Sequence, residues 1–217
     1  MTRRTGVLIV GIVAILLDIL VTRVMVIAMG LDAHEDANLI NKVFFGVLTV
    51  FVILMIWKTS MTFRIGCLKI ENGRGFIREM IEAVIVSAVF IVGMLIFRQY
   101  LNAHDPVAAA RPKFGLYLWI HGRWFYPISV VAQEFFIKGV MQENFRSLKT
   151  PENTHLTIWI NGIFFMILHM NYPVYYLICA GLLCIITGYL YERDKNIWGS
   201  TLIHFVVGFM PRALGLK

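Results

Sequence analysis

Long apolar stretches follow one another along this chain, with short polar segments between them. A transmembrane helix needs about 20 mostly apolar residues to cross the hydrocarbon core of a bilayer. Several stretches reach that length, and the others come close to it. The pattern predicts an all-α integral membrane protein, built as one polytopic bundle of about seven transmembrane helices. The expected spans are 6–30, 43–57, 81–101, 129–145, 157–170, 174–191 and 197–210.

Composition supports this interpretation and excludes a soluble domain. Hydrophobic residues make up 59% of the 217 residues and charged residues 15%, and the mean hydropathy is +0.73. Soluble domains are typically about 45–50% apolar and about 25% charged. The first apolar run is too long for a signal peptide and lacks a cleavage site of small residues. We therefore expect it to be retained as the first span.

Two segments depart from the regular pattern. Residues 114–125 are rich in aromatic residues but are interrupted by polar ones, and Pro127 follows them. This pattern predicts a re-entrant or interfacial segment at headgroup depth. Residues 60–80 interleave apolar and basic residues, which predicts an amphipathic helix on the cytoplasmic leaflet, broken at Asn72-Gly73. The chain thus divides into three N-terminal spans (1–113) and a C-terminal part (114–217).

The net charge of +7 comes from Lys and Arg scattered through short loops. Such scattering is typical of topology signals and of contact with anionic lipid headgroups, and does not indicate nucleic-acid binding. Basic loops on alternate sides place the N-terminus in the cytoplasm, and we expect a bacterial cytoplasmic membrane. Arg98, Arg111 and Lys113 fit this orientation poorly, because they fall at or in a loop that it places outside.

Glu134, His169 and His204 lie inside or at the edge of predicted spans. An ionisable group in hydrocarbon costs roughly 2.5 kcal/mol or more, so it usually faces a polar interior and has a function. At the depths that the spans predict, the three side chains can converge. One carboxylate and two imidazoles form a minimal set for activating a water molecule or holding a divalent metal ion. A structural alternative for Glu134 is an ion pair with Lys138, one turn later.

The two histidines also have structural alternatives. His169 can bond to a backbone carbonyl at the end of its helix, where Asn171 could contribute to a polar pocket. His204 can be a core histidine whose ring is oriented by a hydroxyl, such as that of Ser200 one turn before it.

Three short motifs surround these residues: Gln-Glu-Phe-Phe-Ile-Lys-Gly at 133–139, Phe-Met-Ile-Leu-His at 165–169 and His-Phe-Val-Val-Gly at 204–208. They resemble the motifs Glu-Glu-x-x-x-Arg, Phe-x-x-x-His and His-x-x-x-Asn of the CPBP (CAAX protease and bacteriocin-processing, or Abi) intramembrane proteases. The resemblance covers roughly residues 127–210. It implies a conical protease-like core within 114–217 and catalytic roles for Glu134, His169 and His204, with Phe165 supporting His169.

The motifs also differ from the family pattern at three polar positions. Gln133 stands where the family has its first Glu, and an amide cannot take a proton from water. Lys138 replaces the motif Arg, which keeps the charge but loses the bidentate fork. Gly208 replaces the final Asn and removes a side chain that could help to stabilise an oxyanion. A divalent metal such as zinc, held by Glu134 and the two histidines, is compatible with the resemblance but is not required by it.

Two functions from different classes remain. The first is a CPBP-like endopeptidase that cleaves a membrane-associated peptide or prepeptide with Glu134 as the base. The second is a pseudoprotease that has lost catalysis and binds, scaffolds or regulates a membrane or envelope partner, including in bacteriocin immunity. A small transporter that uses Asp18 and the histidines is a weaker alternative, because the paired interrupted helices typical of such folds are missing from the pattern.

Overall fold

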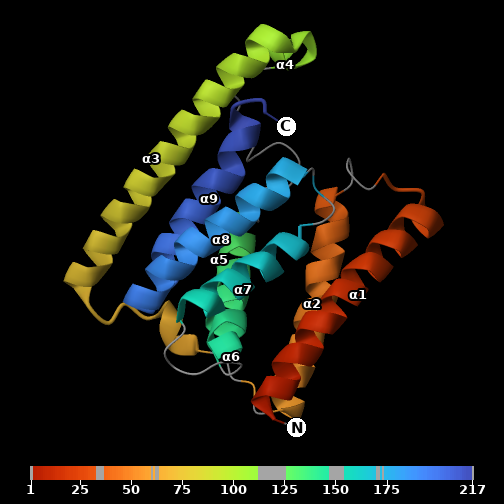
Figure 1. Cartoon of the computed structure of the whole chain (residues 1–217), viewed down its shortest axis with the longest axis vertical. Helices are drawn as coiled ribbons and strands as arrows, with labels where there is room; N and C mark the ends of the chain where they lie inside the picture. The colour runs from red at the N-terminus through yellow and green to blue at the C-terminus, as the bar shows by residue number, and fades with distance from the viewer. Residues whose placement is uncertain are drawn as a thin grey trace. The chain divides into compact units, whose positions relative to one another are not determined.

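The computed structural model describes residues 2–32, 37–59, 61, 64–111, 126–146, 154–169, 172 and 174–216, and every regular element among them is helical. The chain forms two compact units that alternate along the sequence. Unit one comprises Met1–Ile65 and Ile137–Tyr189, and unit two comprises Gly66–Phe136 and Leu190–Lys217. Figure 1 shows the helices of both units with their labels. The predicted re-entrant segment 114–125 lies outside the described residues.

Unit one contains two paired N-terminal helices and the buried polar cluster around Lys138 that is described below. Its helical segments are α1 (Arg3–Met29), α2 (Ala37–Lys58), most of the π-helical stretch Phe135–Gln142, α6 (Glu143–Phe145), α7 (Thr154–Ile167) and α8 (Val174–Asp194), whose last turn belongs to unit two. Helices α1 and α2 lie side by side (Figure 1). The hydroxyl of Thr2 caps α1 by accepting from the Thr5 N–H, and Gly30 ends the helix in the left-handed conformation with φ 66°, which glycine adopts at little cost.

Three described helices are long and apolar enough to cross a membrane: Thr5–Met29 within α1, α3 (Gly73–His104) and α8. The apolar helices Val43–Lys58 and α7 are shorter. Leu8, Ile12 and Leu16 follow one face of α1 and are each more than half exposed, as expected for side chains that contact lipid. These features confirm the predicted all-α membrane fold.

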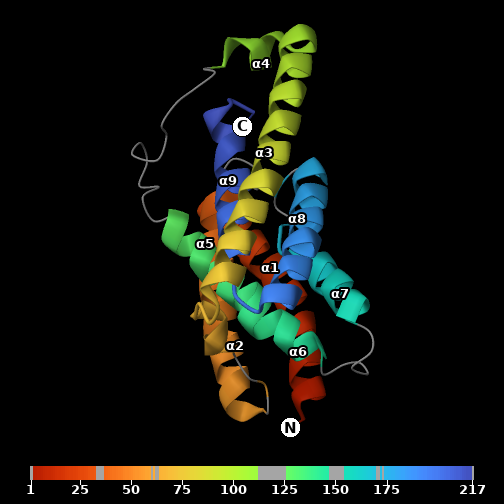
Figure 2. The ribbon, with the colours of Figure 1, turned by 90° about the vertical axis from the view of Figure 1, so that its left-hand side faces the viewer.

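Unit two is organised around α3 and α9 (Trp198–Ala213), which lie side by side in Figures 1 and 2. It also contains a 3₁₀ turn (Ile65–Leu68) except for its first residue, α4 (Pro106–Ala110) and α5 (Tyr126–Glu134). Helix α5 packs on α9. The predicted amphipathic helix over 60–80 is wrong. Its described part is the 3₁₀ turn and the beginning of α3, because Asn72 caps α3 by accepting the N–H groups of Arg74 and Gly75.

Two buried charged side chains of α3 hold the two ends of α9. Glu79, with no exposed surface, accepts the Gly199 N–H at 2.8 Å in the first turn of α9. Arg98, 4% exposed, donates to the Gly215 carbonyl oxygen at 3.2 Å, just beyond the end of α9. A carboxylate at the N-terminus of a helix and a guanidinium at its C-terminus both oppose the helix dipole. This clamp satisfies backbone groups that would otherwise be left unpaired at the helix ends.

The spacing of Glu79 and Arg98 along α3 matches the spacing of the backbone groups that they bind at the two ends of α9. Glu79 and Arg98 are 19 residues apart on α3, which is about 28 Å at 1.5 Å per residue. Gly199 and Gly215 are 16 residues apart, about 24 Å on the same basis. The two helices therefore run parallel, and Glu79 and Arg98, both within the longer α3, lie level with the two ends of α9.

The clamp makes a prediction about stability. Glu79→Ala leaves a buried N–H of α9 without its acceptor, so we expect a loss of about 1–3 kcal/mol and a lower unfolding temperature in detergent. Glu79→Gln keeps an acceptor oxygen and should lose less. Glu71→Ala, at an exposed loop position, serves as the control. Equal unfolding temperatures for Glu79→Ala and Glu71→Ala would contradict the clamp.

Candidate active site

Glu134 and His204 meet inside unit two. Oε1 of Glu134 lies 2.7 Å from Nδ1 of His204, and the two residues are 3% and 7% exposed. Glu134 is the last residue of α5, and His204 lies in the middle of α9, 70 positions later in the chain. An ionised carboxylate can only accept hydrogen bonds, so Nδ1 of His204 carries the ring proton. In this tautomer Nε2 is the ring nitrogen that can accept a hydrogen bond or a second proton. Two of the three predicted catalytic residues thus form one carboxylate–histidine pair.

The beginning of α9 fixes the direction in which the helix presents His204. The side-chain oxygen of Asn196 accepts the Trp198 N–H at 3.1 Å and caps the helix. The Ser200 hydroxyl, predicted as a possible orienting group for the His204 ring, donates to the Ile197 carbonyl oxygen at 2.8 Å. The His204 ring is bonded to Glu134.

Gln133, the residue at the first glutamate position of the motif, is half-buried, and its amide donates to the Ser129 hydroxyl at 3.0 Å. Successive residues of a helix point about 100° apart, so Gln133 and Glu134 project in different directions. Of the two, Glu134 is the residue bonded to His204.

Lys138 lies in unit one with no exposed surface, and its ammonium donates to the Cys184 carbonyl oxygen at 2.8 Å. Gln142 donates to the Gly188 carbonyl oxygen, and Asn161 donates to the side-chain oxygen of Gln142. Lys138 therefore belongs to a buried polar cluster that joins the π-helical stretch to α7 and α8. The alternative of an ion pair between Lys138 and Glu134 stays a prediction.

His169 lies in the turn after α7, in unit one, and is half-buried. Its Nδ1 is 2.9 Å from the Phe165 carbonyl oxygen, and the two rings are 4.5 Å apart between centroids. Phe165 itself is 2% exposed. The spacing of the second motif therefore lets Phe165 orient His169 by both backbone and ring. Asn171 lies outside the described residues, and a site shared by His169 with the Glu134–His204 pair stays a prediction.

No group of three or more His, Cys, Asp or Glu side chains that could hold a metal ion occurs within the described part of the chain. A catalytic zinc site takes three protein ligands, and a metal ion held by Glu134, His169 and His204 stays a prediction. We derive no step through a metal. Cys67, Cys179 and Cys184 are free thiols.

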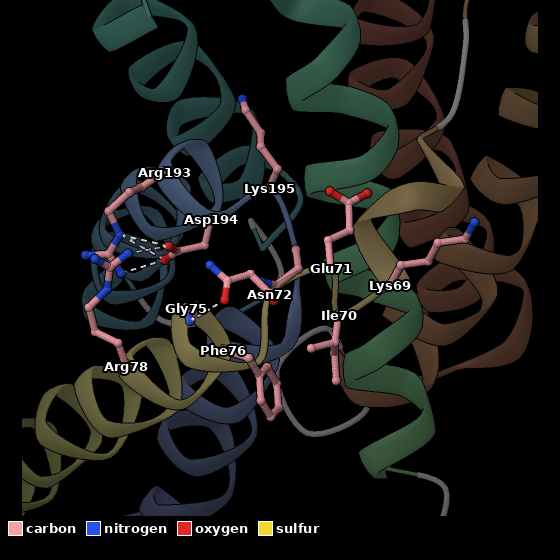
Figure 3. A pocket seen from close by; sticks show the side chains of 11 residues that line it. Lys69, Ile70, Glu71, Asn72, Gly75, Phe76, Arg78, Arg193, Asp194 and Lys195 are labelled. Carbon is pink, nitrogen blue, oxygen red and sulfur yellow. Dashed lines mark hydrogen bonds and ion pairs between the residues drawn. The ribbon is translucent and has the colours of Figure 1, made fainter.

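A polar cavity of about 240 Å³ lies between the beginning of α3 and the connection from α8 to α9 (Figure 3). Arg78 and Arg193 both converge on Asp194, at 3.0 Å and 2.5 Å. Lys195 pairs with Glu192 at 2.5 Å. Because these cations of the lining are already paired with carboxylates, we assign the cavity a structural role.

Sequence reasoning missed Glu79, Arg98 and Tyr126. The first two carried a signal, because each is an ionisable residue within the long apolar helix α3, and such residues have structural or functional partners by default. Arg98 was noticed only as a misfit of the loop-charge pattern. Tyr126, whose ring packs against Phe205 at 5.8 Å between centroids, carried no signal, since it directly follows an aromatic-rich segment.

Comparison with known proteins gives one match. The family model for Rce1-like proteins, described as type II CAAX prenyl endopeptidase Rce1-like, matches residues 112–210. This segment contains all three motifs and confirms the resemblance to the CPBP family. Neither the curated proteins nor the solved structures gave a match.

The Glu134–His204 bond predicts energetic coupling between the two residues. We expect the free energy of unfolding lost by the double variant Glu134→Ala/His204→Ala to fall short of the summed single losses by about 0.5–3 kcal/mol. Denaturant titration in mixed micelles provides the measurement. The exposed His104 supplies the matched control, because Glu134→Ala and His104→Ala should be additive. Additivity of both pairs would show that the carboxylate–histidine bond does not contribute to stability.

Proposed function

We propose that the Rce1-like segment forms the catalytic core of an intramembrane endopeptidase, which hydrolyses a peptide bond in a membrane-associated peptide or prepeptide. The observation that carries this proposal is the buried 2.7 Å contact between Glu134 and His204. A buried ionisable pair on two packed helices, within a segment that matches a peptidase family, is a candidate for acid–base work.

Glu134 and His204 act together as the general base. The Glu134 carboxylate holds the Nδ1 proton of His204 and so keeps a lone pair on Nε2. Nε2 takes a proton from water while the water oxygen attacks the peptide carbonyl carbon, and the carbonyl π pair moves to the oxygen. Glu134 then stabilises the resulting imidazolium. When the intermediate collapses, the C–N bond breaks and the amine takes the proton from Nε2.

This assignment differs from the sequence-based expectation that Glu134 alone is the base. With Oε1 bonded to the imidazole, the carboxylate acts through His204. Gln133 can then stand where the family has its usual base, because proton transfer runs through the histidine. The second motif keeps His169 as a candidate for orienting the attacking water, and its Nδ1 is bonded to the Phe165 carbonyl.

The second candidate is a pseudoprotease that binds or regulates a membrane partner. Gln133 favours it, because an amide at this position cannot take a proton. Fold alone does not decide between the two, since a bundle can persist after catalysis is lost. The variants in the cleavage assay described next distinguish the peptidase from the pseudoprotease.

The decisive measurement is cleavage of a membrane peptide library by the purified protein. We expect wild type to cleave, and Glu134→Ala, His169→Ala and His204→Ala each to lose at least about 10²-fold in kcat, the lower range for a lost acid–base group. His155→Ala is the control, because that exposed histidine bonds to Tyr189 in unit one. If wild type cleaves nothing while Gln133→Glu gains cleavage, the pseudoprotease is correct and the peptidase proposal fails.

A metal-free mechanism predicts resistance to chelators. Incubation with a strong chelator followed by its removal should leave the cleavage rate within about twofold of the untreated enzyme, because every proton in the steps above moves through a side chain. Elemental analysis of the protein before and after treatment provides the measurement. Loss of cleavage together with loss of a stoichiometric metal ion, and recovery on adding it back, would replace this mechanism with the alternative in which Glu134, His169 and His204 are metal ligands.

A further inference from the structure

The face of α9 next to His204 is filled by a residue that the motifs do not include. Gly208 lies one turn after His204, so the two positions share a helix face. A Cβ atom placed on Gly208 would overlap the hydroxyl of Tyr126 and lie 3.2 Å from its Cζ and 3.8 Å from Cδ2 of His204. The phenol hydroxyl therefore occupies the place where a side chain of residue 208 would begin, beside the His204 ring.

The Gly208 position that the hydroxyl fills lies near the Cδ2 edge of that ring. Nδ1 of His204 faces Glu134, and among the ring atoms of His204 the one nearest to the Gly208 position is Cδ2, which is bonded to Nε2. Nε2 is the atom that the proposed mechanism uses for proton transfer. Tyr126 opens α5, the helix that ends with Glu134, and its ring packs on Phe205 of α9. Two helices of unit two thus bring a hydroxyl, an imidazole and a carboxylate to one place.

We infer that the Tyr126 hydroxyl is the hydrogen-bond donor that stabilises the oxyanion during peptide hydrolysis, in place of the amide that Gly208 lacks. The inference rests on the proposed function. As water adds to the carbonyl carbon, negative charge collects on the carbonyl oxygen, and a donor fixed next to the base stabilises that charge without reorganisation. The phenol keeps its proton, and the hydrogen bond weakens again when the C=O bond re-forms.

Glycine at 208 and tyrosine at 126 depend on each other. Any side chain at 208 begins where the hydroxyl lies, so an Asn there would displace the phenol. Gly208, which on sequence alone suggested a lost function, makes room for Tyr126. Tyr126 is half-buried, and its hydroxyl lies against α9 at Gly208.

The first test removes only the hydroxyl. Tyr126→Phe should lower kcat by about 10²–10³-fold, the loss measured for a single oxyanion donor, with KM changed by less than about threefold and the unfolding temperature unchanged. Tyr100→Phe is the control, because Tyr100 is 57% exposed on α3 and stacks on His104. If wild type cleaves and Tyr126→Phe keeps its kcat, the inference is overturned while the peptidase proposal stands. If wild type does not cleave, both fail.

A second test reads the contact without using activity. Gly208→Asn should lower the unfolding temperature in the wild-type background, because the new side chain meets the phenol, and should lower it much less in the Tyr126→Ala background. In the cleavage assay, the double variant Tyr126→Ala/Gly208→Asn should have a kcat at least about tenfold higher than that of Tyr126→Ala, because one amide then replaces the hydroxyl as donor. Equal destabilisation by Gly208→Asn in both backgrounds would show that Tyr126 does not occupy this place.

Discussion

The electrostatic clamp between α3 and α9 is the constraint on which the site in unit two depends. The ends of a membrane helix carry N–H and C=O groups without intrahelical partners, and in apolar surroundings each unsatisfied group costs free energy. Glu79 and Arg98 supply those partners from a single neighbouring helix. Because both ends of α9 are bound to α3, the helix cannot slide or rotate without breaking a buried charged hydrogen bond. His204 lies in the middle of this fixed helix, and its ring therefore meets Glu134 at a defined height.

With His204 held in this position, two departures from the family motifs, Gln133 and Gly208, can be explained together. Glu134 bonds to the imidazole, so in the proposed mechanism proton transfer runs through His204, and Gln133 bonds instead to Ser129 of its own helix. Gly208 leaves space that the Tyr126 hydroxyl fills. The proposed reaction thus has a carboxylate, a base and a donor without the first Glu and the final Asn of the family motifs. A reaction site is defined by the positions of its chemical groups, and different residues can place them.

Much of this could be predicted from the pattern of residues. The apolar stretches gave the helices to within a few residues at most ends, and the ionisable residues within them pointed to Glu134 and His204 before any geometry was known. The amphipathic helix over 60–80 was wrong before its predicted break at Asn72-Gly73, because Ile65–Leu68 form a 3₁₀ turn, whereas the break itself coincides with the beginning of α3. Orientation of the His204 ring by Ser200 was reasonable from spacing, but that hydroxyl bonds to the backbone of its own helix. Local hydrogen bonds of Ser commonly compete with tertiary ones in this way.

The sequence by itself determined that this chain is a helical membrane protein, singled out three ionisable residues within or beside apolar stretches, and showed a resemblance to a peptidase family over roughly residues 127–210. Those properties follow from composition, helical periodicity and short motifs, which are local. Only the tertiary structure decided that Glu134 bonds to His204, that α3 holds α9 at both ends and that Tyr126 lies against Gly208. Each of these pairs is separated by at least 70 positions along the chain. Which helices pack together, and in what register, is set by the sum of many long-range contacts, and no local pattern of residues contains that information.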